Sequence, residues 1–125
     1  MIKMKLWLDD DPERDPPADW TIVRTADDAI DFLQAFKVSL ISLDHDLGVF
    51  VQDPYPREIT GMAVIEWMNS HRVFPAIINI HSFNEPAARR MLKALSVAAL
   101  QWRYDKQVAG ELSALLAELE MNKEK

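Results

Sequence analysis

Three clusters of acidic, histidine and other polar residues each follow directly after a short apolar run of the chain. They are Asp9-Asp10-Asp11, Asp44-His45-Asp46 and His81-Ser82-Phe83-Asn84. Carboxylates crowded at one place repel each other, and a divalent cation relieves that repulsion. An imidazole beside them can move a proton near neutral pH. If the clusters meet in space, these residue types suit metal-assisted chemistry on a phosphate ester.

The acidic residues of the first two clusters are candidate metal ligands. An oxygen-rich ligand set with few histidines suits Mg²⁺ or Mn²⁺ better than structural Zn²⁺. We therefore predict a Mg²⁺ or Mn²⁺ site made by Asp9, Asp10 and Asp44. The bland alternative for the first cluster is a solvated turn, because acidic residues often follow a strand.

Four residues are candidates for the catalytic work itself: His81, His45, Asp44 and Asp46. His81 is the better of the two histidines. Neighbouring residues on a strand alternate in direction, so His45 could point away from the site in a structural role. Asp46 has an alternative role as the cap of a turn in which Gly48 supplies a positive φ.

Substrate binding is assigned first to Arg14, which stands in a proline-rich segment after the first cluster. A guanidinium can clamp a phosphate with two parallel hydrogen bonds. Ser82 and Asn84 offer neutral hydrogen bonds to the same group.

Composition limits the other function classes. The 125 residues fit one domain, and 49% hydrophobic residues are enough for a core. A net charge of −6 disfavours non-specific binding to nucleic acid, so we expect no duplex DNA partner. There is no cysteine, which excludes disulfides and thiolate chemistry. No apolar stretch approaches the roughly 20 residues that cross a bilayer, so we expect no membrane partner and a cytoplasmic location.

Short apolar runs alternate with amphipathic stretches, which is typical of an α/β parallel sheet. The predicted strands cover residues 4–8, 20–25, 39–43, 76–80 and 97–104. The predicted helices cover residues 26–36, with Thr25 as N-cap, 60–68, with Thr60 as N-cap, 86–95 and 110–120. Residues 49–59 contain two prolines and read as a loop.

The predicted fold is a flavodoxin-like, receiver-like open sheet of five parallel strands in the order 2-1-3-4-5. Residues 1–120 form its single domain, and residues 121–125 are a frayed tail. Only residues 10–19 join the first two strands, and Pro12, Pro16 and Pro17 there forbid an ordinary helix, so a loop replaces the first helix. In this order strands 1, 3 and 4 are adjacent, and ligands bind outside their carboxyl ends. The three clusters should therefore meet.

Five segments resemble the family of cyclic-phosphate-processing receiver-like domains. They are LWLDDD, VRTADDAI, ISLDHDLG, TGMAVIEW and IHSFNEPAARRM, which fall between residues 6 and 95. The resemblance implies a receiver-like fold and a role in handling cyclic phosphate ends of RNA. The matching positions are Asp9, Asp10, Arg14, Asp44, His45, Asp46, Gly48, Thr60, Gly61, His81, Ser82 and Asn84. Among these, Thr60 and Gly61 join the predicted substrate-binding residues on the strength of the resemblance.

The spacing of the arginine departs from the family pattern. The family tends to place it close after the acidic pair, as D-D-x-R, whereas three residues separate Asp10 from Arg14 here. We expect this insertion to displace Arg14.

Three functions remain in competition. The first is a metal-assisted phosphoesterase acting on a small phosphate ester or an RNA end. The second is a signalling module like an ordinary response-regulator receiver, with Asp44 as phospho-acceptor, Ser82 as switch hydroxyl and Lys106 as a candidate for the receiver lysine. The third is a nucleotide-binding domain without catalysis. The two histidines favour the phosphoesterase, because a phospho-switch has no need for imidazoles beside its acceptor.

Overall fold

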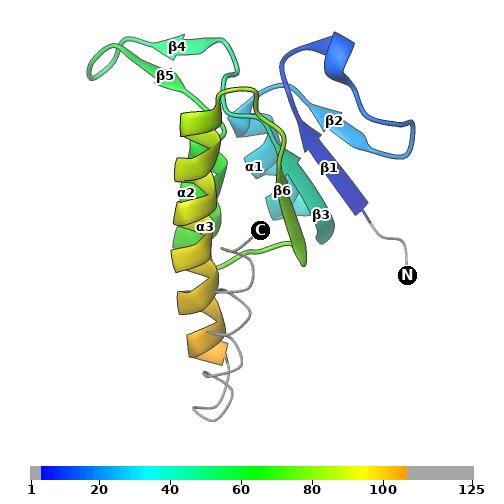
Figure 1. The fold of residues 1–125 in the computed structure, drawn as a ribbon, viewed down its shortest axis with the longest axis vertical. Coiled ribbons are helices and arrows are strands. Elements are labelled where there is room, and N and C mark those ends of the chain that lie inside the picture. Colours follow the sequence, from blue (N-terminus) through cyan, green and yellow to red (C-terminus); the bar gives the residue numbers. More distant parts are fainter. Residues whose placement is uncertain (1–3, 107–125) are drawn as a thin grey trace.

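A computed structural model describes residues 4–106, and its centre is a four-stranded parallel sheet (Figure 1). The strands are β1 (Met4–Leu8), β2 (Thr21–Val23), β3 (Val38–Leu43) and β6 (Ile77–Ile80), in the order β2-β1-β3-β6. These are the first four predicted strands in the predicted order. The fold is therefore an α/β receiver-like fold, with β1, β3 and β6 side by side.

One face of this sheet forms the hydrophobic core. Leu6 and Leu8 are paired in register with Ile41 and Leu43, and all four are fully buried. Neighbouring residues of a strand point to opposite faces. Ser42, which is paired with Trp7 on one side and Asn79 on the other, therefore lies with them on the second face. This second face continues into the site described below.

Three helices pack against the core face. They are α1 (Ala26–Ala35), α2 (Met62–His71) and α3 (Glu85–Lys106). Their larger side chains in the buried cluster are Leu33 from α1, Val64, Ile65 and Met68 from α2, and Met91 and Leu95 from α3. Helix α1 begins as predicted, with the Thr25 hydroxyl accepting a hydrogen bond from the backbone N–H of Asp28 at 3.1 Å.

The connection between β1 and β2 is short and holds a 3-10 helix, η1 (Pro12–Arg14). Asp11 caps it, since its carboxylate accepts a hydrogen bond from the backbone N–H of Glu13 at 3.0 Å. Three residues of 3-10 helix are enough to turn the chain by about one full turn. The side chain of Arg14 is thereby directed back towards the end of β1.

The prediction of a loop at residues 49–59 is wrong. This segment forms an antiparallel hairpin of β4 (Val49–Val51) and β5 (Arg57–Ile59), which projects beside the carboxyl end of the sheet (Figure 1). Val49 and Ile59 are paired and pack against the core, which anchors the hairpin. The prolines of the segment lie between the two strands, where they remove no ladder hydrogen bond.

The predicted fifth strand at residues 97–104 is also wrong, because these residues belong to α3. No glycine or proline lies between Leu95 and Lys106 to end the helix, and the alanines and leucine of residues 98–100 favour its continuation. The sheet of the described region therefore has four strands rather than five. The predicted helix at 110–120 and the tail at 121–125 lie outside the described residues. Among residues 4–106, no helix is both long and apolar enough to cross a bilayer.

Candidate functional site

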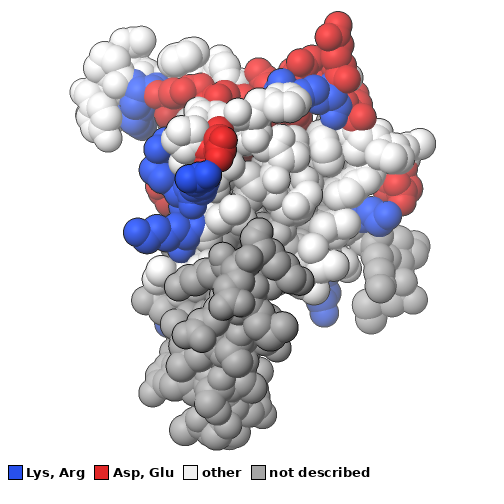
Figure 2. Space-filling model, viewed as in Figure 1, with Lys and Arg blue, Asp and Glu red and all other residues white. Residues whose placement is uncertain are grey.

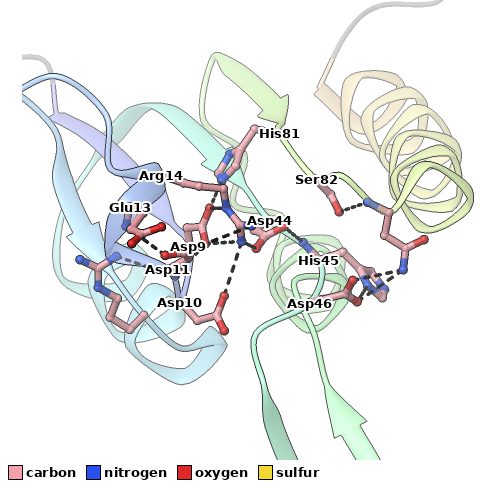
Figure 3. Close-up of polar contacts among 12 residues, drawn as sticks. Asp9, Asp10, Asp11, Glu13, Arg14, Asp44, His45, Asp46, His81 and Ser82 are labelled. Carbon is pink, nitrogen blue, oxygen red and sulfur yellow. Dashed lines mark hydrogen bonds and ion pairs between the residues drawn. The ribbon is translucent and has the colours of Figure 1, made fainter.

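The three polar clusters lie together at the carboxyl ends of β1, β3 and β6 (Figure 3). Sheet hydrogen bonding extends one residue beyond the strands: the Asp44 N–H donates to Leu8 O, and the His81 N–H donates to Leu43 O, both at 3.0 Å. Asp9, Asp44 and His81 each stand two positions after a residue of the face opposite the helices. Their side chains continue that face, which brings them into contact with one another.

Asp9 is the buried anchor of the site. Its carboxylate has no exposed surface and receives two hydrogen bonds from Arg14, Nε to Oδ2 at 2.9 Å and Nη2 to Oδ1 at 2.8 Å. The backbone N–H of Asp11 donates to Oδ1 at 2.9 Å. Burial raises the pKa of Asp9, but the hydrogen bonds from Arg14 and Asp11 outweigh it, and the pKa falls to about 2. Asp9 is therefore ionised at neutral pH.

Arg14 holds several carboxylates at once. Besides Asp9, its Nη2 donates to Asp44 Oδ2 at 3.1 Å and lies 3.7 Å from Asp10 Oδ1, while Nη1 lies 3.7 Å from Asp11 Oδ2. Hydrogen bonding to Asp9 raises the pKa of the guanidinium. The additional residues before Arg14 do not keep it from the carboxylates, because the 3-10 helix returns its side chain to the end of β1.

Asp44 is almost completely buried at the end of β3. Its Oδ1 accepts a hydrogen bond from the His45 backbone N–H at 2.8 Å, and its Oδ2 faces Arg14. Burial is the largest influence on the pKa of Asp44 and, together with the charge of Asp9, raises it to about 6. Asp44 therefore keeps its proton to a higher pH than an ordinary aspartate does.

The predicted metal ligands lie close enough to share one cation. One oxygen from each of Asp9, Asp10 and Asp44 lies within 4.8 Å of the other two. Hard carboxylate oxygens are the donors that divalent cations such as Mg²⁺ prefer. Burial is the main cause of the raised pKa of Asp44, and the nearby charge of Asp9 adds to it, so a cation bound there would stabilise the ionised form. The residues therefore fit a divalent cation, although Arg14 already supplies one positive charge to the same oxygens.

His81 has a partner for each ring nitrogen. Nε2 lies 3.2 Å from Asp9 Oδ2, and Nδ1 lies 2.7 Å from the hydroxyl of Ser42, which is fully buried. The imidazole stacks on Trp7 with ring centroids 3.9 Å apart. Burial lowers the pKa of His81, although Asp9 opposes the change. Because a carboxylate accepts only, the neutral ring carries its proton on Nε2 and accepts from Ser42 at Nδ1.

The side chain of His45 lies apart from these contacts. His45 directly follows Asp44, and neighbouring residues of an extended chain point in opposite directions. Its Nδ1 lies 2.7 Å from Asp46 Oδ1, and Asn84 Nδ2 lies 3.3 Å from Asp46 Oδ2. The Ser82 hydroxyl accepts from the Asn84 backbone N–H at 3.1 Å, and Asn84 Oδ1 accepts from the Ala87 N–H at 3.2 Å, which caps α3. The predicted residues thus fall into an inner cluster (Asp9, Asp10, Arg14, Asp44, His81) and an outer cluster (His45, Asp46, Ser82, Asn84).

Thr60 and Gly61 adjoin the site through the backbone. The Gly61 N–H donates to His45 O at 2.9 Å, and a Cβ on Gly61 would stand 1.8 Å from Asp44 O. The Thr60 hydroxyl accepts from the Met62 N–H at 3.2 Å, but the N-cap position of α2 is Gly61 rather than Thr60. Gly48 has the expected positive φ of 67°.

Sequence reasoning missed two residues that support His81. Ser42 is a serine inside an otherwise apolar strand, two positions before Asp44, and this pattern places both side chains on one face. Trp7 stands in the same relation to Asp9 on β1. The sequence signal that could have identified them is a polar or aromatic residue two positions before the aspartate that follows a strand.

Comparison with known proteins identifies one family and one solved structure. A family model described as "Cyclic-phosphate processing Receiver domain" matches residues 4–97. The chain is also similar to the crystal structure of the signal receiver domain of a putative LuxO repressor protein from Vibrio parahaemolyticus. That likeness has 18% identity and a TM-score of 0.44, and it covers 86% of this chain and 98% of the other. No curated protein matches.

Proposed function

The chain belongs to the family of cyclic-phosphate processing receiver domains, and we propose that it is a metal-assisted phosphoesterase that opens a cyclic phosphate at an RNA end or in a related small ester. One observation carries the proposal. The oxygens of Asp9, Asp10 and Asp44 converge within 4.8 Å beside Arg14 and His81, and the outer cluster with His45 adjoins them. This is a donor set for a cation and for a phosphate together.

The charges of the inner cluster explain why a cation is needed. Asp9, Asp10 and Asp44 contribute three carboxylates, and Arg14 contributes one positive charge. A phosphate would be repelled by this excess of negative charge. Mg²⁺ or Mn²⁺ bound by Asp9, Asp10 and Asp44 would neutralise the excess and polarise a phosphoryl oxygen.

Arg14 is the residue best placed to orient the phosphate. Its side chain is 33% exposed, so the guanidinium reaches the surface even though Nε and Nη2 are held by Asp9. Within the described residues, Nη1 has an ion pair with Asp11 at 3.7 Å but no hydrogen bond, and its N–H groups can be offered to a phosphate oxygen. Ser82 of the outer cluster precedes α3 and lies on the other side of the site from Arg14 (Figure 3). Asn84 follows it in the chain and bonds Asp46.

The hydrogen bonds of the two histidines favour different roles. When Asp46 accepts the proton of His45 Nδ1, the neutral imidazole leaves Nε2 unprotonated and able to take a proton. In ring opening, a water oxygen bonds to phosphorus and its proton passes to His45 Nε2. The phosphorus–oxygen bond to one ribose oxygen breaks, and that oxygen receives the proton back.

His81, by contrast, has its Nε2–H directed at Asp9 and its Nδ1 occupied by Ser42. These bonds suit a positioning residue that fixes the Asp9 carboxylate. The catalytic role predicted for His81 from the sequence stays a prediction, and the geometry favours His45 for the proton transfer.

A signalling role with Asp44 as phospho-acceptor is the second candidate, supported by the place of Asp44 at the end of β3 beside two further aspartates. Lys106, the candidate for the lysine that a receiver needs, lies far from the site. Lys106 ends α3, which begins next to the site at Glu85 and spans 22 residues, about 30 Å at 1.5 Å per residue.

The proposal is tested by turnover of a nucleoside 2′,3′-cyclic phosphate with and without Mg²⁺ or Mn²⁺. We expect turnover that EDTA abolishes and that falls by about 10²-fold or more in His45→Gln. His71→Gln is the matched control, because His71 ends α2 at the far end from the site and contacts Trp67 of its own helix. Absence of turnover with any divalent cation would refute the phosphoesterase. A mass increase of about 80 Da after incubation with a small phosphodonor would favour the signalling role instead.

A further inference from the structure

The ring of Phe83 is the most exposed large hydrophobic side chain of the described residues, with 84% of its surface accessible. It lies between β6 and α3, in the same segment as His81 and Asn84. Its ring centroid is 5.3 Å from Cζ of Arg14, so the ring stands over the guanidinium assigned to the phosphate. The position of Phe83 therefore connects it with the site rather than with the core.

The segment that carries Phe83 is held firmly on both sides. Ser82 accepts a hydrogen bond from the Asn84 backbone, and Asn84 in turn bonds Asp46 and caps α3 through Ala87. The ring is thus presented to solvent by a fixed backbone. A ring so exposed contributes little burial to the fold, and an aromatic residue fixed at the edge of a polar site is suited to contact with a ligand.

The ligand group that suits this ring is a nucleobase. Every base offers a flat face that stacks on an aromatic side chain, and this stacking is the usual way in which proteins hold unpaired bases. In a nucleotide one ribose separates the phosphate from the base. A phosphate held by Arg14 consequently brings the base of the same nucleotide within reach of the neighbouring ring.

The surface charge argues that this contact is with one terminal nucleotide. Figure 2 shows acidic side chains, with some basic ones between them, along the edge that carries η1 and the hairpin. Asp10, Asp11 and Glu13 lie beside the site (Figure 3). A long polyanion would be repelled along this edge. Stacking on an apolar ring supplies attraction that does not depend on further positive charge.

We propose that Phe83 is a stacking platform for the base of the terminal nucleotide whose phosphate lies at Arg14. This rests on the proposed function and names its substrate class: a nucleotide end, rather than a base-free cyclic phosphate. The residue determines specificity and takes no part in the bond-breaking step.

Binding of two probes tests the assignment without requiring turnover. Calorimetry in Mg²⁺ compares adenosine 3′-monophosphate with methyl ribofuranoside 3-phosphate, which has the same sugar and phosphate but no base. We expect the wild-type protein to bind the nucleotide about tenfold more tightly. Phe83→Leu should remove this preference by weakening the nucleotide alone, and Phe83→Trp should keep it.

Phe36→Leu is the matched control. Phe36 is 50% exposed but precedes β3, at the amino end of the strands and away from the site. Equal affinity of the wild-type protein for the two probes, or an equal loss of both in Phe83→Leu, would overturn the assignment. A base preference that depends on Phe83 in a protein that turns over no cyclic phosphate would keep this inference and refute the phosphoesterase. Metal-dependent turnover together with a base preference that Phe83→Leu leaves unchanged would support the phosphoesterase and overturn this inference.

Discussion

Arg14 donates to both carboxylate oxygens of Asp9, through Nε at 2.9 Å and Nη2 at 2.8 Å, although Asp9 is fully buried. The guanidinium therefore serves as the resident cation of the inner cluster. A divalent cation bound by the same carboxylates would share them with Arg14. The stability of the metal-free protein and its affinity for metal should consequently depend on Arg14 in opposite directions.

Replacing Arg14 should destabilise the metal-free protein. Arg14→Gln leaves a buried carboxylate without its charged partner, and we expect the free energy of unfolding to fall by about 3 kcal/mol. Urea denaturation in EDTA measures the change, and added Mn²⁺ should restore more stability to Arg14→Gln than to the wild-type protein. Arg89→Gln is the control: Arg89 pairs with Glu85 on the exposed side of α3, and its loss should cost less than about 0.5 kcal/mol. Equal losses in the two variants would contradict the role given to Arg14.

The raised pKa of Asp44 predicts a pH dependence with a definite sign. The folded protein holds the Asp44 proton up to a pKa of about 6, against an ordinary value of 3.8. Rising pH between these values therefore removes stability, by up to about 3 kcal/mol from this group. The lowered pKa of His81 acts oppositely, since stability then rises as pH approaches 6.5 from below. Subtracting the free energy of unfolding of Asp44→Asn from that of the wild-type protein removes the His81 contribution and the others that the two proteins share.

Urea denaturation in EDTA at pH 4, 5, 6 and 7 tests this prediction. The wild-type protein should lose stability relative to Asp44→Asn as the pH rises through this range. Asp27→Asn, on the exposed first turn of α1, provides a matched comparison. A difference between wild type and Asp44→Asn that stays constant with pH would rule out the raised pKa.

The partners of His81 predict its tautomer. Asp9 can only accept a hydrogen bond, so at pH 7 the ring should be neutral with its proton on Nε2, and Ser42 should donate to Nδ1. Two-dimensional ¹⁵N NMR of the histidine side chains distinguishes the two tautomers and the charged form. Ser42→Ala should alter the Nδ1 resonance. A charged ring at pH 7, or a proton on Nδ1, would show that His81 does not position Asp9 in this way.

Two glycines near the site should respond differently to the same substitution. Gly61→Ala places a Cβ 1.8 Å from Asp44 O, which requires backbone movement at the site, and we expect a loss of about 3 kcal/mol or more. At Gly48 the nearest contact of a Cβ is 3.4 Å away, and the cost is that of a positive φ, about 1 kcal/mol. Urea denaturation of both variants checks the order, and a smaller loss in Gly61→Ala would contradict the close approach.

Much of the fold was predictable because four apolar runs marked the strands. Three of these runs ended in polar clusters, which marked the edge of the sheet where they meet. The prediction of a fifth strand was wrong because residues 97–104 contain no glycine or proline to end α3, which continues through them. The hairpin was missed because its strands have only three residues each, too few to show a period.

The convergence of the candidate site residues followed from topology, but their pairing did not. Whether an imidazole meets Asp9 or Asp46 depends on the strand face that it occupies, and one residue of register decides it. The contact between Arg14 and Asp9 depends on the 3-10 helix, whose three residues leave little periodic signal.

The central claim is that the cluster of Asp9, Asp10 and Asp44 supports cation-dependent opening of a cyclic phosphate. The most direct test follows a nucleoside 2′,3′-cyclic phosphate by ³¹P NMR. One sample contains EDTA throughout; the other is incubated with excess Mn²⁺ for fixed times, after which the Mn²⁺ is chelated and the spectrum is recorded. We predict that the cyclic resonance is replaced by that of a phosphomonoester only during exposure to the cation, and that Asp10→Asn greatly slows the conversion. A cyclic resonance that persists with every divalent cation, or that disappears equally fast in EDTA, would contradict the account.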